Sequence, residues 1–425
     1  MNSKQRLLVV GSGGRLYREY LLAGAARGHQ VWLLDSAEPT WQRRYIAGAS
    51  VVPLLDTARI IPDQERLLKT AVEVAAEGGV TGAFTYDETL VVTTAHIAET
   101  LGLPGLTVAG VENCRNKHRT RQVLTAAGLP QPRFALVHTV GEAATEADRI
   151  GFPLVVKPRG MGASIGVVRV EQAKELARAF DIAHLASYGG NPAYEGGVLV
   201  EELVTGAEIS VDGLVYEGRY EPLFLARKQV GPAPYFEEVG HLLDPDDELM
   251  SDGSLRDVLV RAHRSLGLST GITHTEVMLT ARGPVVIEVN ARLGGDLIPY
   301  LGKLATGIDP GEVAAVLATG GPPPAITPIR CRVVGIRFAY PPRDCRVTEV
   351  RVPSPQSAPG LLEAAAMVAP GAELRLPPKG YISRYAYVIC TGEDRAECAA
   401  RLSSATGLAS VTLEPPGEDP AGLLG

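Results

Sequence analysis

One segment, ITHTEVMLTARGPVVIEVN at residues 272–290, constrains the fold most, because it reads as a β-hairpin. Its two arms are rich in β-branched residues and are separated by Ala-Arg-Gly at residues 281–283. A three-residue turn here, with the glycine at a positive φ angle, pairs the arms symmetrically about Arg282. Glu276 then faces Glu288. The sequence therefore predicts a sheet in which two acidic side chains are direct cross-strand neighbours.

The paired acids predict a bound cation. Directly opposed residues have Cβ atoms roughly 4.5–5.5 Å apart, a distance at which two like charges destabilise a sheet. Period-two alternation assigns Ile287 and Val289 to one face and the following residues to the other: His274, Glu276, Met278, Glu288 and Asn290. Two carboxylates and an amide oxygen are hard ligands that suit Mg²⁺. The alternative is a protonated acid, or an acid paired with an arginine such as Arg282.

A lysine followed by a glycine-rich loop, VVKPRGMGASIGV, occupies residues 155–167. Glycines let backbone N–H groups approach a ligand closely, and several such groups form a nest for anionic oxygen. The lysine precedes the loop, so the spacing is not that of a Walker A motif. We expect Lys157 to project from a strand end beneath a phosphate-binding loop that contains Gly162 and Ser164. The alternative is a glycine-rich surface hairpin with a partly exposed lysine.

Two further patterns lie near these motifs. The segment VLVEELVTGAE at residues 198–208 is an apolar strand that ends in paired acids, which suits an adenine slot with a ribose-binding carboxylate beyond it. Arg292 follows the hairpin and precedes Gly294 and Gly295, and an arginine with glycine amides can hold an oxyanion. The alternatives are solvated acids at a strand end and a surface arginine.

Composition excludes several classes of protein. The 425 residues carry a net charge of −7 without blocks of one sign, which argues against nucleic-acid binding and against a basic membrane patch. Five scattered cysteines argue against a disulfide framework and a structural zinc site. We find no signal-peptide core and no apolar run of roughly 18 residues. We expect a cytoplasmic protein with small-molecule partners.

The order of elements predicts several lobes. Strand and helix patterns alternate through the first hundred residues, which indicates a βαβ lobe. Its GSGGRL motif, with Asp35 after the next strand, is close to a dinucleotide fingerprint, but Leu16 replaces the last glycine. We therefore favour a tight turn over a nicotinamide site. The expected domain boundaries are 1–112, 113–200, 201–325 and 326–425.

Taken in order, Lys117, Lys157 with its glycine loop, EELVTGAE and TE…IEVNAR resemble the ATP-grasp superfamily of carboxylate–amine ligases over roughly residues 1–320. The segment KQVGPAPYFEEVGHLLDP at residues 228–245, which we expect to be a long loop, is similar to a segment of the L-amino-acid ligases that form dipeptides or extend peptides. The resemblance implies an ATP-grasp fold with α/β and α+β domains. A Rossmann-like preATP-grasp domain would precede two ATP-grasp subdomains and a C-terminal α+β lobe.

The resemblance also implies roles for individual residues. Glu276, Glu288 and Asn290 would hold one or two Mg²⁺ ions, for which Mn²⁺ could substitute. In the reaction that we expect for such an enzyme, Arg292 and Gly295 would hold an oxyanion. His274, Glu88 or Glu238 could orient or deprotonate an amine, and residue spacing does not select among the three. The implied ATP-binding residues are Lys117, Lys157, Gly162, Ser164, Glu201, Glu202, Val204, Glu208 and Lys228.

The resulting hypothesis is an ATP-dependent ligase that activates a carboxylate as an acyl phosphate and joins it to an amine. The expected partners are small carboxylate and amine substrates, with no nucleic acid or membrane, and a homodimer stays open as the assembly state. Two alternatives remain: another ATP-grasp enzyme, such as a biotin carboxylase-like or purine-pathway ligase, and a nucleotide-binding regulatory protein without turnover.

Overall fold

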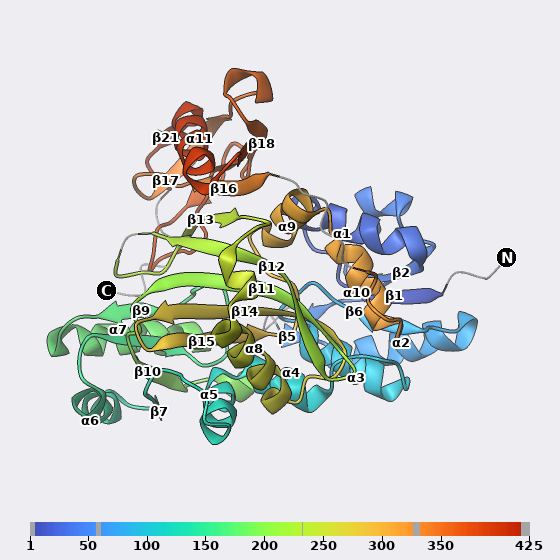
Figure 1. The fold of residues 1–425 in the computed structure, drawn as a ribbon, viewed down its shortest axis with the longest axis horizontal. Helices are drawn as coiled ribbons and strands as arrows, with labels where there is room; N and C mark the ends of the chain where they lie inside the picture. Colours follow the sequence, from blue (N-terminus) through green and yellow to red (C-terminus); the bar gives the residue numbers. More distant parts are fainter. Residues whose placement is uncertain (1–4, 57–60, 232, 326–331, 418–425) are drawn as a thin grey trace.

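The computed structural model describes residues 5–56, 61–231, 233–325 and 332–417. Within these ranges the strands form five sheets, the largest with eight strands (Figure 1). The N-terminal lobe and the C-terminal lobe flank this central sheet. The predicted α/β and α+β multidomain architecture is confirmed. None of the helices in the described ranges combines the length and apolar character that a membrane crossing needs.

The N-terminal lobe contains the predicted βαβ unit, a parallel sheet in the order β3-β2-β1-β6. Strand β1 is buried on both faces, because Leu7 and Leu8 belong to different core clusters, as is typical of parallel sheets. The turn after β1 is fastened by Asp35, which accepts hydrogen bonds from the Ser12 amide and hydroxyl. The elements are β1 (Arg6–Val10), α1 (Arg15–Gly28), β2 (Gln30–Asp35), β3 (Gly48–Val51), β4 (Leu55–Asp56), β5 (Ile61–Pro62), α2 (Gln64–Gly78), β6 (Gly82–Phe84) and α3 (Val91–Thr100).

Two helices connect this lobe to a smaller antiparallel sheet in the order β7-β10-β8-β9. Asn116 lies between helices α4 and α5 and caps α5, because its side chain accepts hydrogen bonds from the backbone amides of His118 and Arg119. Lys117 therefore occupies the first turn of α5. Apolar residues of α6 and α7 form one core cluster with this sheet. The elements are α4 (Val108–Arg115), α5 (Lys117–Ala126), β7 (Phe134–Val137), α6 (Val140–Ile150), β8 (Leu154–Pro158), β9 (Val168–Val170), α7 (Ala173–Ser187) and β10 (Val198–Glu202).

The central sheet has the order β15-β14-β11-β12-β13-β16-β20-β18. Half of the expected long loop at residues 228–245 is strand instead, since the end of β12 and the whole of β13 fall within it. Backbone pairing between β12 and β13 explains the difference, because it satisfies polar groups that a loop would expose. The elements up to residue 318 are β11 (Ala207–Tyr216), β12 (Arg219–Val230), β13 (Glu238–Leu243), α8 (Gly253–Leu266), β14 (Gly271–Thr280), β15 (Gly283–Asn290), α9 (Ile298–Thr306) and α10 (Pro310–Ala318).

The C-terminal lobe shares this sheet. Strand β16 pairs with β13, so the sheet continues across the boundary expected at residue 325, and the four expected boundaries stay predictions. The described part of the lobe also contains a three-stranded sheet and the helix α11. Cysteines 114, 345, 390 and 398 are buried free thiols, and Cys331 lies outside the described residues. The elements are β16 (Val333–Ala339), β17 (Cys345–Arg351), β18 (Leu361–Ala366), β19 (Glu373–Leu374), β20 (Ala386–Gly392), α11 (Arg395–Leu408) and β21 (Ser410–Glu414).

Candidate active site

A cavity of about 230 Å³ collects side chains from the small sheet, the glycine loop, the central sheet and the C-terminal lobe. Of the site residues predicted from the sequence, Glu88 alone does not line it. Residues far apart in the chain thus converge as the motif order suggested: Lys117, Lys157, Gly162, Ser164, Glu201, Glu202, Val204, Glu208, Lys228, His274, Glu276, Glu288, Asn290, Arg292 and Gly295.

The hairpin β14–β15 brings the two predicted metal-binding acids together. Glu276 pairs with Glu288, and His274 pairs with Asn290, in the register that the sequence predicted. Asn290 is buried, whereas the two glutamates keep about a fifth of their side chains exposed. An opposed pair of carboxylates beside an amide is a donor set that fits Mg²⁺.

The turn of this hairpin differs from the prediction. Thr280 pairs with Gly283, so the turn holds two residues instead of three. A β-bulge that leaves Ile287 out of the pairing absorbs the difference, and the predicted register returns at Glu288. The bulge also corrects the predicted faces, because Ile287 lines the cavity while Val289 lies in a core cluster.

Two buried lysines, one on α5 and one on β8, line the cavity. The Lys117 ammonium lies 2.6 Å from the Met161 carbonyl of the glycine loop and 3.1 Å from Glu288 Oε1. The Lys157 ammonium lies 2.6 Å from Glu201 Oε2. Burial lowers the pKa of Lys157, although Glu201 opposes this effect. Because both charges are shielded from water, they can act strongly on an anionic ligand.

Glu201 also bonds a residue that sequence reasoning missed. Arg121, which is 1% exposed, donates two hydrogen bonds to the Glu201 carboxylate and two more to the carbonyls of Val286 and Ile287 at the bulge. Burial raises the pKa of Glu201, but Arg121 and Lys157 outweigh it and lower the value to about 2. The Glu201 side chain therefore anchors the small sheet to the hairpin, and its adenine contact through the backbone stays a prediction.

Ion pairs near the surface hold the next part of segment 198–208, which we call the hinge. Glu202 pairs with Arg133 at 3.2 Å and with Arg282 at 3.0 Å. Arg282, which we considered as a partner for the opposed acids, thus bonds the hinge and leaves the hairpin acids to other cations. Val204 is buried beside these residues and lines the cavity.

A group of charged side chains spans neighbouring strands of the central sheet. The Lys228 ammonium, on β12, lies 2.7 Å from Glu208, 2.6 Å from Glu238 and 3.1 Å from Glu276. Burial opposes the charge of Lys228, but the three carboxylates raise its pKa well above the ordinary value. Lys228 is therefore a permanent cation among the acids predicted to bind ribose and metal.

Asp212 fixes the predicted oxyanion turn. This buried carboxylate accepts a 2.7 Å hydrogen bond from the Gly294 amide and lies 3.1 Å from His274 Nδ1. Burial alone would lower the pKa of His274, but Asp212 and Glu276 raise it to about 9. A protonated imidazole can orient a substrate but cannot accept its proton, which favours the orienting role for His274.

Arg292 reaches back to the N-terminal lobe. Its guanidinium pairs with Glu88 and donates to the Leu293 carbonyl at 2.6 Å, while Arg115 lies 3.3 Å from the same Glu88. Burial raises the pKa of Glu88, but the surrounding cations outweigh it and hold the pKa below the usual range. Glu88 is therefore an ionised partner of two arginines, which weakens its candidacy as the base.

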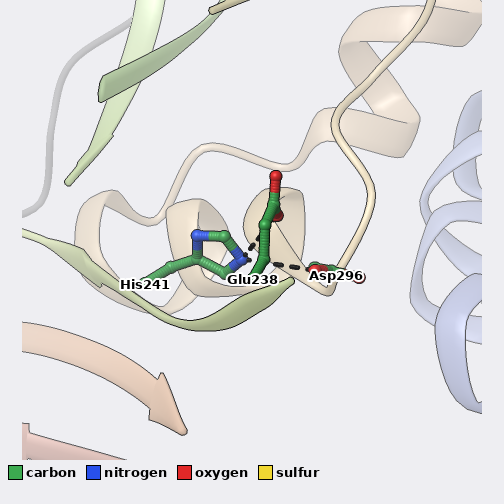
Figure 2. A group of neighbouring side chains, drawn as sticks. All are labelled: Glu238, His241 and Asp296. Atoms are coloured by element: carbon green, nitrogen blue, oxygen red, sulfur yellow. Dashed lines mark ion pairs between the residues drawn. The ribbon is translucent and has the colours of Figure 1, made fainter. Parts of the chain in front are cut away.

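Sequence reasoning also missed a cluster next to Lys228. Figure 2 shows Glu238 and Asp296 both paired with His241, whose Nε2 atom lies 3.3 Å and 3.5 Å from their respective carboxylates. These three side chains could surround a metal ion, but Lys228 and Arg384 already contact the acids, so we assign none there. Spacing in the sequence gives no signal for Arg384, which comes from the C-terminal lobe.

Three family models match successive parts of the chain. They describe an ATP-grasp N-terminal domain at residues 23–105, an ATP-grasp domain at 150–300 and an L-amino acid ligase C-terminal domain 2 at 337–414. The chain belongs to the ATP-grasp superfamily. This confirms the resemblance, and residues 337–414 extend the likeness to L-amino-acid ligases into a region that we could not match by motifs.

Individual proteins are also similar to parts or all of this chain. Protein y4rH of Sinorhizobium fredii is 37% identical over 54% of this chain and 46% of its own length. Alanine–anticapsin ligase of Bacillus subtilis is 27% identical over 57% of this chain and 54% of its own length. The chain thus spans about half the length of these curated relatives. An L-amino acid ligase structure from Bacillus licheniformis matches the fold with a TM-score of 0.80, at 23% identity, over 97% of this chain and all of that chain.

Proposed function

We propose that this protein is an ATP-dependent ligase that activates a carboxylate as an acyl phosphate and joins it to an amine. The products would be an amide or peptide bond, ADP and phosphate. One observation carries the proposal: two buried lysines, two opposed carboxylates and an arginine beside a glycine turn converge on one cavity. The likeness to an L-amino acid ligase domain supports amino acids or peptide-like acids as substrates.

The chain's own residues account for nucleotide and metal binding. Glu276, Glu288 and Asn290 would hold Mg²⁺, or Mn²⁺ in its place, because carboxylate and amide oxygens suit both ions. When bound, the metal would neutralise charge on the transferred phosphate. Lys117 and Lys157 would bind the phosphates together with the glycine loop, and Lys228 is a further phosphate candidate. The adenine and ribose would be held by the predicted residues of segment 198–208, which are Glu201, Glu202, Val204 and Glu208.

In the first proposed step, a substrate carboxylate oxygen attacks the γ-phosphorus of ATP while the bond to ADP breaks. Positioning and charge neutralisation by the lysines would supply most of the rate enhancement. Arg292 and the amides of the glycine turn would then hold the carboxyl-derived oxygen. A closed glycine loop would protect the acyl phosphate from water.

In the second step, a neutral amine attacks the acyl carbon, phosphate leaves, and the amine loses a proton. Glu238 is our candidate to accept it, because Glu88 is bound by two arginines and His274 is protonated near neutral pH. The Glu238 carboxylate also contacts the Lys228 ammonium, so the amine proton would compete with Lys228 for this carboxylate.

The deciding experiment is phosphate release with ATP, Mg²⁺ and a pairwise matrix of amino acids, with mass spectrometry of the products. We expect ADP, phosphate and a new amide in equal amounts for at least one pair. ADP formation that depends on bicarbonate and needs no amino acid would favour a carboxylase-like enzyme instead. Absence of ADP formation with every pair would favour a regulatory nucleotide-binding protein. Light scattering of the same sample tests whether the protein forms a homodimer, which the sequence left open.

A further inference from the structure

The C-terminal lobe reaches the cavity through the segment that precedes β20. Ile382 and Arg384 both line the cavity, and the Arg384 side chain is 2% exposed. The Ile382 amide donates a 3.1 Å hydrogen bond to Glu237 Oε2, beside the start of β13. This lobe therefore forms part of the cavity wall.

Arg384 makes its contacts with three different parts of the chain. Its two terminal nitrogens each bond one oxygen of Asp296 at 2.6 Å, and one of them also donates to the Glu238 carbonyl at 2.8 Å. Its Nε atom donates to the Tyr340 hydroxyl at 2.8 Å, and its guanidinium lies 3.8 Å from the centre of the Phe338 ring. The planar guanidinium of Arg384 is bonded along its edge and packed on one face, so it has little freedom to move.

The partners of Arg384 need such support. Asp296 follows the glycine turn and has a φ angle of 51°, a left-handed conformation that is unfavourable for a residue other than glycine. The bidentate contact fixes its carboxylate despite this backbone. Glu238 is held at the same time through its carbonyl, which leaves its side chain directed to Lys228 and His241.

This end of the cavity suits an amine. Glu238 and Asp296 direct their carboxylates at the same His241 nitrogen, as Figure 2 shows, and a carboxylate can orient an amine or accept its proton. Every guanidinium nitrogen of Arg384 already donates to a protein acceptor. Arg384 therefore acts through Asp296 and Glu238 rather than on a substrate.

We propose that Arg384 is a positioning residue that fixes Asp296 and Glu238 at the amine-binding end of the cavity. The C-terminal lobe thereby contributes to the choice of amine substrate. This inference rests on the proposed ligase function, since it assigns one end of the same cavity to the amine.

The test compares Arg384→Met with Arg401→Met, using the carboxylate and amine pair found in the screen. Arg401 is a matched control, because it bonds Thr391 and Glu397 within the C-terminal lobe and does not line the cavity. We expect Arg384→Met to lower kcat/KM for the amine by about 10- to 100-fold through a higher KM. The affinity for a fluorescent ATP analogue, measured without substrates, should change by less than about twofold. Arg401→Met should match the wild type in both measurements.

Two further variants keep the test decisive. If Arg384→Met fails to fold, the double variant Arg384→Met/Asp296→Asn removes the unpaired buried charge, and the same rise in amine KM is expected. Arg384→Lys should recover only part of the loss, because an ammonium cannot reproduce the bidentate contact. An unchanged amine KM in the folded variants, or an equal loss of nucleotide affinity, would overturn the inference. A wild-type protein that forms no product with any pair would instead overturn the ligase proposal itself.

Discussion

Asp212 accepts a hydrogen bond from the Gly294 amide at 2.7 Å, which places the glycine turn directly beside His274. A Cβ atom on Gly294 would lie 2.7 Å from His274 Nδ1 and 3.0 Å from Asp212 Oδ2. A Cβ atom on the neighbouring Gly295 would meet nothing within 4 Å. Two adjacent glycines thus tolerate a side chain very differently.

Gly294→Ala should therefore lower the free energy of unfolding by about 1–3 kcal/mol, because buried side chains must shift to admit the methyl group. Urea denaturation measures this difference. Gly295→Ala is the matched control and should change stability by only about 0.5 kcal/mol. Equal effects of the two substitutions on stability would show that close packing around Gly294 does not restrict which side chain this position tolerates.

Glu288→Gln should reduce ATP turnover by about 100-fold or more, because it removes a charged ligand from the predicted metal site. Stability should change much less, since the substitution weakens a contact with Lys117 but also relieves repulsion from Glu276. Phosphate release and thermal melting measure the two quantities. Glu221→Gln, at an exposed ion pair on the same sheet, is the control, and a folded Glu288→Gln with normal turnover would reject the metal role.

Arg121→Met should destabilise the protein by about 3–5 kcal/mol, because it breaks a buried ion pair. It also leaves the carbonyls of Val286 and Ile287 without this donor. Urea denaturation tests the expectation, with Arg133→Met as an exposed control at the same hinge. A cost below about 1 kcal/mol would mean that Lys157 alone satisfies Glu201.

The buried side chain of His263 should make the stability of the protein depend on pH. The Leu259 carbonyl can only accept, so His263 Nδ1 donates to it at 2.7 Å, and Nε2 accepts from the Thr273 hydroxyl at 2.9 Å. Burial lowers the pKa of this neutral imidazole to about 4, below the value of roughly 6.5 expected in the unfolded chain. The unfolded state therefore takes up the proton first as the pH falls.

The contribution of His263 to stability should be complete above about pH 6.5 and should decline by about 3 kcal/mol as the pH falls to about 4. Urea denaturation across this range should give a flatter profile for His263→Gln than for the wild type. His138→Gln, at an exposed position, is the control and should retain the wild-type slope. Identical slopes in all three proteins would contradict the assignment.

The hairpin shows how far the sequence could predict the site. The pairing of Glu276 with Glu288 was predictable, because alternation and turn chemistry are local properties of residues 272–290. The shorter turn and the bulge were not, because Arg121 bonds the bulge from a helix about 165 residues away in sequence. The two local differences cancel, which is why the register at the acids was nevertheless correct.

The contact between Asp296 and Arg384 shows the opposite case, because it could not be predicted from the sequence. Asp296 and Arg384 are 88 residues apart, and neither lies in a pattern that distinguishes it from an ordinary surface charge. Their relationship arises only when β16 and β20 extend the central sheet beyond β13. Strand pairing of this kind determines which charged side chains are buried. The spacing of residues within one segment does not predict that pairing.

The contacts of Lys117 with Glu288 and of Lys228 with Glu276 have a thermodynamic consequence. A triphosphate that attracts these lysines would release the two carboxylates for a divalent ion, and an ion that binds the carboxylates would free the lysines for phosphate. Each ligand would then raise the affinity for the other by the same factor, as reciprocal linkage requires. Metal and nucleotide should enter as a cooperative pair.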